Sequence, residues 1–168
     1  RGTIIDDLIN SGIQNRNMAI GGTSAGMAIL GGFYFSAENG TVTSATALSN
    51  PFDVDVTVDH TPFINLPILG DVVTDTHYDD PNRKGRHVVF MSRMLNDHGV
   101  VAKGIACDEY TAVCIDENGM ASVYGEHPDY DDYAYFLQVN CEYPLNVPET
   151  IQANEPLTWN MNGEALKV

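Results

Sequence analysis

The residue with the clearest chemical meaning is Ser24, which lies in the run Gly21-Gly22-Thr23-Ser24-Ala25-Gly26. The run completes the pattern G-x-S-x-G, in which a serine occupies the tight turn between a strand and a helix and is exposed for attack on a carbonyl carbon. Glycines are expected at its flanks because the turn is strained and a Cβ there would clash with the neighbouring strand or helix. A glycine-rich connection that happens to contain a serine is the alternative.

A serine hydroxyl needs a base to remove its proton, and His77 is the best placed of the five histidines. It follows an apolar strand predicted at Val72-Val73, at the sheet edge where α/β proteins carry their sites. The other four lie inside a predicted helix, at a helix end, or shortly before prolines in loops (His87, His98, His60 and His127).

Four of the eight basic residues fall within eleven positions directly after this histidine: Arg83, Lys84, Arg86 and Arg93. They could simply form the basic first turn of a helix predicted over residues 88–95. Because cations are unfavourable at a helix N-terminus, we instead expect these arginines to clamp a carboxylate, such as a peptide terminus or an aspartyl side chain.

The surrounding pattern predicts the elements that position these residues. A helix over residues 2–13, a strand at Met18 to Ile20, the turn at Ser24 and a helix from Ala25 to about Leu30 form half of a doubly wound α/β unit. The N-terminus of the second helix lies behind Ser24 and would favour negative charge on a substrate carbonyl oxygen.

The rest of the chain is predicted to be rich in short strands. Extended pieces are expected at 33–35, 42–43, 53–59, 100–101, 105–106, 112–115, 120–124, 135–139, 157–160 and 165–168, with a hairpin turn at 116–119. Asp108 and Glu109 lie between two of these strands. They are interpreted either as acids that contact a cationic substrate or as part of a turn.

Composition limits the possible functions. The 168 residues, 43% of them hydrophobic, predict one globular domain, and no run approaches the roughly 18 apolar residues of a membrane helix. The net charge of -15 argues against nucleic acid and anionic membranes as partners and favours a cationic substrate. The three cysteines form no CxxC motif, and no metal or cofactor is expected.

Taken together, the serine run, Asp75-x-His77-Tyr78, Arg83-Lys84-Gly85-Arg86 and Gly104-Ile105-x-x-Asp108-Glu109-x-Thr111-Ala112 resemble the cyanophycinase family of serine peptidases, relatives of the aspartyl dipeptidases. The resemblance covers residues 1 to about 125. It implies a doubly wound α/β sheet similar to that of the class I glutamine amidotransferases. The peptidase domain is expected to include residues 1–127, with a β-rich extension of the same domain at 128–168.

The resemblance also implies roles for individual residues. Ser24 matches the nucleophile, His77 the general base, Glu38 the acid that orients the base, and the backbone N–H of Ala25 one oxyanion donor. Members of the family carry early strands and a glycine-rich loop with the second oxyanion donor ahead of this region, so the N-terminal part of the domain is expected to be missing from these residues.

The substrate-binding segment of the family is matched in part. Asp75, Arg83 and Arg86 occupy its acidic and basic positions, whereas Thr76 stands where the family has glutamine and Pro81 where it has a further arginine. The substrate implied is an aspartyl peptide or an arginine-bearing polyaspartate. A homodimer is left open, and so is the compartment, cytoplasmic or secreted.

There are three alternatives to a cyanophycinase-like peptidase. One is an inactive homologue or binding module that retains the fold, and a second is an α-aspartyl dipeptidase. The third, an α/β-hydrolase esterase, is disfavoured because the histidine of that class comes near the chain end, whereas about ninety residues follow His77.

Overall fold

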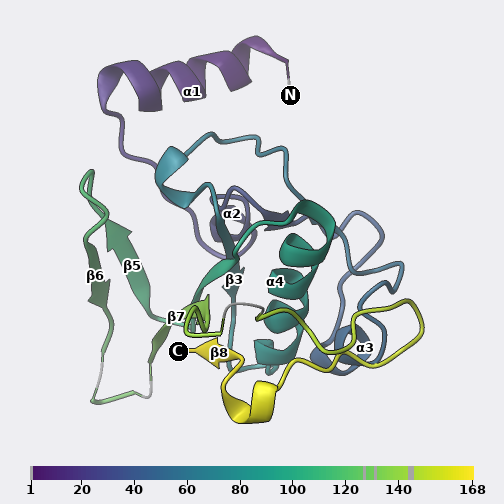
Figure 1. The fold of residues 1–168 in the computed structure, drawn as a ribbon. Coiled ribbons are helices and arrows are strands. Elements are labelled where there is room, and N and C mark those ends of the chain that lie inside the picture. Colours follow the sequence, from purple (N-terminus) through teal and green to yellow (C-terminus); the bar gives the residue numbers. More distant parts are fainter. Residues whose placement is uncertain (1, 127, 131, 144–145) are drawn as a thin grey trace.

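The computed structural model describes residues 2–126, 128–130, 132–143 and 146–168. These residues form a mixed α/β fold, as expected from the sequence. Its main sheet has the strand order β3-β4-β7-β8, formed by Val72–Thr76, Lys103–Cys107, Ala134–Val139 and Leu166–Lys167 (Figure 1). Strands β3 and β4 run parallel, while the pairs β4-β7 and β7-β8 are antiparallel.

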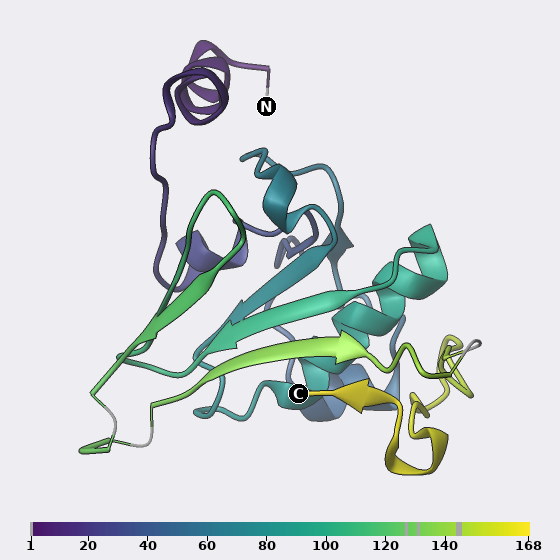
Figure 2. The same ribbon diagram turned by 60° about the vertical axis from the view of Figure 1, so that its left-hand side comes forward.

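Helix α4, Lys84–His98, connects β3 to β4 and packs against one face of this sheet (Figure 2). Its apolar residues recur at helical spacing, and Val89, Phe90, Met91 and Met94 are completely buried. The helix ends at Gly99, whose φ of 65° is a left-handed conformation that favours glycine. The helix predicted at 88–95 is therefore confirmed, and it extends several residues further at each end.

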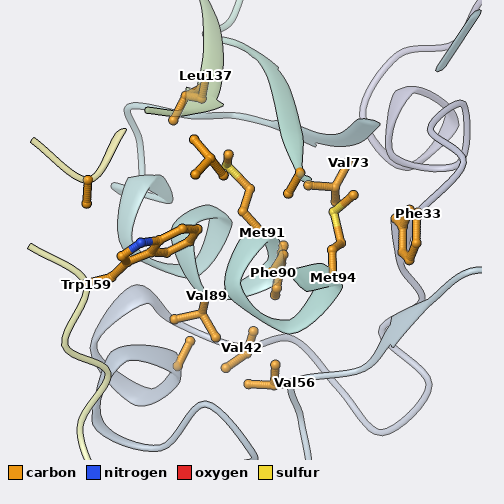
Figure 3. Packing of buried hydrophobic residues seen from close by; sticks show 14 residues of the cluster. Phe33, Val42, Val56, Val73, Val89, Phe90, Met91, Met94, Leu137 and Trp159 are labelled. Atoms are coloured by element: carbon orange, nitrogen blue, oxygen red, sulfur yellow. The ribbon is translucent and has the colours of Figure 1, made fainter. Parts of the chain in front are cut away.

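The hydrophobic core lies between α4, the sheet and the chain that surrounds the helix (Figure 3). Phe33 and Val73 contribute from one side, and Leu137 and Trp159 from the C-terminal part of the chain. The indole Nε1 of Trp159 donates to the Asn146 side chain at 2.8 Å. The C-terminal residues therefore share one core with α4 and the main sheet.

Smaller elements surround the core. Strands β1, Tyr34–Phe35, and β2, Val58–Asp59, pair antiparallel, and β5, Ala112–Ile115, forms the expected hairpin with β6, Ala121–Tyr124. Two short 3₁₀ helices are also present, η1 at Pro67–Leu69 and η2 at Met161–Gly163. None of the described helices has the length and apolar character needed to cross a membrane.

Helix α3, Ser44–Ser49, was not predicted; it begins directly after the extended piece expected at 42–43. The Thr43 side chain accepts a hydrogen bond from the Thr46 N–H at 3.1 Å and caps the helix. Short helices of this kind depend on tertiary packing, and α3 packs against α4.

The N-terminal helix α1, Ile4–Arg16, stands apart from the sheet in both views (Figures 1 and 2). The Asn10 side chain bonds this helix to the following part of the chain: it donates to the Phe63 carbonyl and accepts from the Asn65 N–H. The strand expected at Met18 to Ile20 is wrong: these residues are irregular. A strand needs a neighbouring strand for its backbone hydrogen bonds, and no described strand pairs with this segment.

A buried ion pair joins β3 to the first turn of α4. Asp75 and Arg86 are 2% and 4% exposed, and the guanidinium donates two hydrogen bonds to the carboxylate, at 2.8 and 2.5 Å. The remaining Nη1 donates to the Val42 carbonyl at 3.4 Å, and the rings of Phe35 and Phe90 lie against the cation. This pair explains a cation at a helix N-terminus, because a carboxylate neutralises it there.

We expect Arg86→Met to lower the free energy of unfolding by about 3–5 kcal/mol, because it leaves the Asp75 carboxylate buried without a counter-charge. The double variant Asp75→Asn/Arg86→Met removes that charge and should recover much of the loss. Urea unfolding of the parent, the single variant and the double variant measures both effects. A loss below about 1 kcal/mol in the single variant would contradict the argument.

Candidate active site

The turn that carries Ser24 has a strained backbone and leads directly into a helix, as a nucleophile elbow does, but no described strand precedes it. Ser24 has φ 52° and ψ −125°, and helix α2, Ala25–Ala28, begins at the next residue. A Cβ added to Gly22 would lie 2.3 Å from the Gly26 carbonyl carbon, whereas one added to Gly26 would meet no atom within 4 Å. The requirement for glycine is therefore confirmed at position 22. It arises because the backbones of Gly22 and Gly26 approach each other, and not from a clash with a neighbouring strand.

Strand β3 fixes the position of this elbow. The hydroxyl of Thr74, which is buried, donates to the carbonyl oxygens of Met27 at 2.8 Å and Ala28 at 3.2 Å. These carbonyls belong to the end of α2, where helix carbonyl groups lack partners within the helix. The strand that carries His77 thus also anchors the helix behind Ser24.

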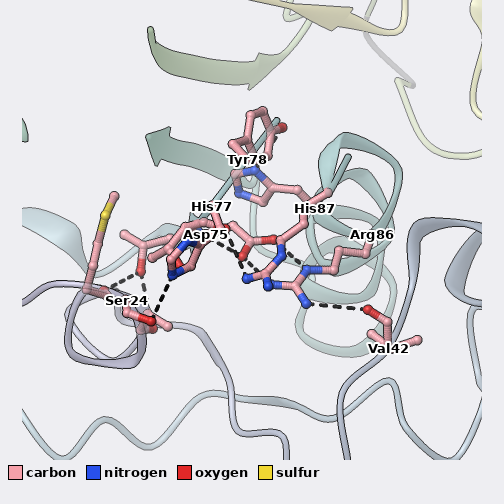
Figure 4. A network of polar contacts seen from close by, with 12 residues as sticks. Ser24, Val42, Asp75, His77, Tyr78, Arg86 and His87 are labelled. Carbon is pink, nitrogen blue, oxygen red and sulfur yellow. Dashed lines mark hydrogen bonds and ion pairs between the residues drawn. The ribbon is translucent and has the colours of Figure 1, made fainter. Parts of the chain in front are cut away.

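His77 follows β3 directly and contacts the serine (Figure 4). Its Nε2 lies 3.0 Å from the Ser24 Oγ, within hydrogen-bond distance, and its side chain is 39% exposed. The residue has φ 50°, an uncommon left-handed conformation for a side chain with a Cβ. The prediction that His77 and Ser24 lie together is confirmed.

The acid that contacts His77 is Glu109, and the assignment of this role to Glu38 is wrong. The Glu109 Oε1 is hydrogen-bonded to the His77 Nδ1, on the opposite side of the ring from Ser24. Glu38 is exposed in a bend beyond β1. Glu109 reaches the histidine because β3 and β4 pair in parallel with Thr76 opposite Cys107, so the residues after both strand ends lie together.

The backbone N–H of Ala25, which the resemblance assigned as an oxyanion donor, has no hydrogen-bond partner among the described residues. It belongs to the first residue of α2. The N–H groups of Gly26 and Met27, in contrast, are bonded to the carbonyls of Thr23 and Ser24 at 2.9 Å each. The free N–H therefore lies directly beside the candidate nucleophile.

Two of the four residues expected to bind substrate are internal instead. Asp75 and Arg86 neutralise each other in the buried ion pair, so neither presents its charge to a ligand. Thr76 lines the cavity described below, and its N–H is bonded to the Asp75 carboxylate at 2.8 Å. Arg83 lies close to the site, but its guanidinium donates to the Thr76 carbonyl at 3.1 Å.

A cavity of about 620 Å³ opens beside the elbow. Ser24, His77 and Glu109 form part of its wall. The remaining wall is largely apolar and comes from α2, η1, β4 and β5, including Met27, Leu69, Ile105, Val113 and Ile115. The polar groups thus converge on one part of a mostly apolar pocket, the arrangement typical of small-molecule sites.

Asp108, the neighbour of Glu109, also lines the cavity but is bonded to a different part of the chain. It is 5% exposed and accepts hydrogen bonds from the Tyr133 N–H at 3.2 Å and the Tyr135 hydroxyl at 3.5 Å. Burial raises the pKa of this carboxyl, and the negative charge of Asp79 acts in the same direction. The two acids that the sequence left as substrate contacts or a turn thus have separate environments, and only Glu109 contacts the histidine.

The other histidines have structural surroundings. His87 is completely buried, where its Nδ1 lies 3.1 Å from the Tyr78 hydroxyl and its Nε2 3.1 Å from the Val73 carbonyl (Figure 4). Burial lowers the pKa of His87, which favours the neutral ring. The rings of His60 and His98 stack with centroids 4.8 Å apart, and His127 lies outside the described residues.

Within the described residues, no three His, Cys, Asp or Glu side chains are grouped so that they could hold a metal ion. Comparison of the chain with models of known protein families and with curated proteins finds no match. The assignment of function therefore depends on the geometry of the site and on the sequence motifs.

The cavity wall contains two cysteines that should differ in reactivity. Burial, together with Asp108, raises the pKa of Cys107 to about 11, so at pH 8 only about one molecule in a thousand carries the reactive thiolate. Cys114 is exposed. We expect iodoacetamide at pH 8 to modify Cys114 in the native protein and Cys107 only after unfolding or as the pH approaches 11, as measured by peptide mass spectrometry. Equal modification of both cysteines in the native protein would contradict this prediction.

Proposed function

We propose that the protein is a serine hydrolase that cleaves peptide or isopeptide bonds at aspartyl residues through an acyl-enzyme, as the cyanophycinase-like motifs imply. The observation that carries the hydrolase assignment is the chain of contacts from the Ser24 hydroxyl through the His77 ring to the Glu109 carboxylate. A serine hydroxyl, an imidazole and an acid in this order form a catalytic triad.

Each group has a defined task in the proposed reaction. His77 Nε2 accepts the Ser24 proton as Oγ bonds to the substrate carbonyl carbon, and the oxyanion that forms is bound by the Ala25 N–H. His77 then donates the proton to the leaving amine as the C–N bond breaks. Water, deprotonated by the same ring, hydrolyses the acyl-enzyme and releases Ser24.

Glu109 supports this cycle without exchanging a proton. By accepting from Nδ1, the carboxylate holds the ring in the tautomer whose Nε2 is free to act as a base. It also stabilises the imidazolium that forms when His77 takes the serine proton. The role requires an ionised acid on the far side of the ring, which is where Glu109 lies.

The order of the three residues along the chain differs from that of the α/β-hydrolases. In that class the acid lies between serine and histidine, whereas here Ser24 and His77 precede Glu109. The cyanophycinase-like motifs implied an acid in the same intermediate place, at Glu38, so the esterase alternative is disfavoured by the position of the histidine and not by that of the acid. We propose that the β3-α4-β4 unit is part of a doubly wound sheet of the glutamine amidotransferase-like kind that the motifs imply.

The aspartyl specificity is supported by the sequence motifs and by the charge of the molecule. The net charge of -15 would attract a cationic substrate such as arginine-bearing polyaspartate. The buried pair of Asp75 and Arg86 gives no support to a substrate clamp at these two positions. We therefore compare two substrates, the arginine-bearing polyaspartate and an α-aspartyl dipeptide.

We expect a fluorophosphonate probe to label the parent protein on Ser24 and Ser24→Ala not at all, because the probe bonds to the activated Oγ. Gel fluorescence and peptide mapping measure the labelling, and release of amine from β-aspartyl-arginine polymer and from α-aspartyl dipeptides measures turnover. Equal labelling of both proteins would overturn the hydrolase assignment. Serine-dependent labelling and ester hydrolysis without cleavage of either aspartyl substrate would overturn only the specificity.

The two glutamates provide a matched test of the third residue. Glu109→Gln should lower kcat by about 10³- to 10⁴-fold, because an amide no longer holds the required tautomer or stabilises the imidazolium. Glu38→Gln makes the same chemical change at an exposed position and should leave kcat at the parental value. Steady-state kinetics of both variants on one substrate decide the assignment, and a large loss in Glu38→Gln with none in Glu109→Gln would reverse it.

A further inference from the structure

We propose that Arg83 is a positioning residue for His77, and that it fixes the peptide groups on either side of this histidine instead of binding substrate. The proposal rests on the proposed function, since it assigns a role within the same site. It departs from the expectation that the arginines after the histidine clamp a carboxylate of the substrate.

Arg83 contacts the chain on both sides of His77. Its Nη1 donates to the carbonyl of Thr76 at 3.1 Å, and its backbone N–H donates to the carbonyl of Tyr78 at 3.0 Å. The residue before the histidine and the residue after it are therefore held by the same arginine. Arg83 itself is fixed at the start of α4, where it is the residue that precedes the helix.

The neighbouring backbone groups are fixed as well. The Thr76 N–H donates to the Asp75 carboxylate at 2.8 Å, and the Tyr78 N–H donates to the Cys107 carbonyl at 3.2 Å. Asp75 and Arg83 thus hold the two ends of Thr76, one by its N–H and the other by its carbonyl. Of these contacts, the one from the Arg83 side chain can be removed without breaking the buried ion pair.

His77 needs such support because its backbone conformation is unfavourable. A φ of 50° brings the Cβ of a non-glycine residue too close to its own backbone, so it persists only where the surrounding structure holds it. The ring must also present Nε2 to Ser24 and Nδ1 to Glu109 at the same time. If the Thr76 carbonyl were released, the peptide before His77 could rotate and the ring would leave this alignment.

The arginine is poorly placed to clamp a carboxylate. A guanidinium binds a carboxylate with two nitrogens on one edge. Nη1 of Arg83 is already bonded to Thr76, and Nε is shielded from solvent with no partner among the described residues. The edge formed by Nη1 and Nη2 is therefore blocked at Nη1, and the edge formed by Nε and Nη2 is covered at Nε.

The charged groups that act on Arg83 include the acid that contacts His77. Burial and the positive charge of Arg86 lower the pKa of the guanidinium, while the carboxylates of Asp75 and Glu109 act in the opposite direction. The cation thus lies within electrostatic reach of the acid that binds His77.

The test compares Arg83→Met and Arg83→Lys with Lys84→Met as the control. Lys84→Met also removes a positive charge next to Arg83. The Lys84 ammonium, however, lies over the Tyr135 ring and not against the chain around His77. A small neutral phosphonofluoridate reports serine reactivity without needing a carboxylate clamp. The low-field proton NMR resonance of the His77 Nδ1–H, assigned by its loss in His77→Gln, reports the contact with Glu109.

We expect Arg83→Met to slow labelling by about 10²-fold, as misplacement of a catalytic group by about 1 Å can do, and to abolish or broaden the resonance. Arg83→Lys should restore part of both, because an ammonium can still reach the Thr76 carbonyl. Lys84→Met should change neither. In turnover, kcat should fall while KM stays near the parental value. Should Arg83→Met fail to fold, Arg83→Gln, which retains a shorter N–H donor, replaces it with the same expectation.

The proposal is overturned if the folded Met or Gln variant keeps the parental labelling rate and resonance. It is also overturned if kcat is retained while KM rises for substrates that carry a carboxylate, since that result assigns Arg83 to substrate binding. Labelling of Ser24→Ala at the parental rate would overturn the hydrolase function instead. In that case the resonance still decides whether Arg83 positions His77.

Discussion

The parallel pairing of β3 with β4 is the constraint on which the site depends. In this register Thr76 lies opposite Cys107, and the strands end together. The residues that follow, His77 on one strand and Glu109 on the other, are then within contact of each other. Since Thr74 on β3 also binds the end of α2, one strand sets the distances from the histidine to both the serine and the acid. The pairing of these two strands therefore brings His77 and Glu109 together, and the Thr74 hydroxyl bonds α2 to the same strand.

The buried ion pair beneath the site gives the basic segment after His77 a second purpose. A charge pair with so little exposure costs desolvation energy, and it contributes to the fold only when its hydrogen bonds are satisfied. Asp75 meets that condition by accepting from Arg86 and from the Thr76 N–H. The pair fixes α4 against the strand end, so Arg83, three residues before Arg86, reaches the Thr76 carbonyl. The concentration of arginines is thus explained largely by the need to hold the strand end in place.

The sequence was sufficient to identify the residues whose signals are local. Ser24 lies within a short glycine pattern and His77 directly after an apolar strand, and the structure brings the two together. Glu109 could not be selected, because its contact depends on the register of two strands about thirty residues apart. Its place just beyond the strand predicted at 105–106 was the available signal, since residues that follow adjacent parallel strands lie at the same edge of the sheet. The strand at Met18 to Ile20 failed for a related reason: strand formation depends on neighbours that a local pattern does not specify.

Backbone strain gives an independent reason to locate function at this edge of the sheet. Eight non-glycine residues of the described chain have positive φ, and three of these are asparagines, which tolerate the conformation well. Of the other five, Ser24, His77 and Tyr110 line the same cavity. Each such residue costs on the order of 1–3 kcal/mol and persists only where its surroundings hold it. Ser24 and His77 adopt these conformations where their side chains meet at 3.0 Å, beside an N–H of Ala25 that donates to no described acceptor. This coincidence supports the proposed catalytic role of the serine.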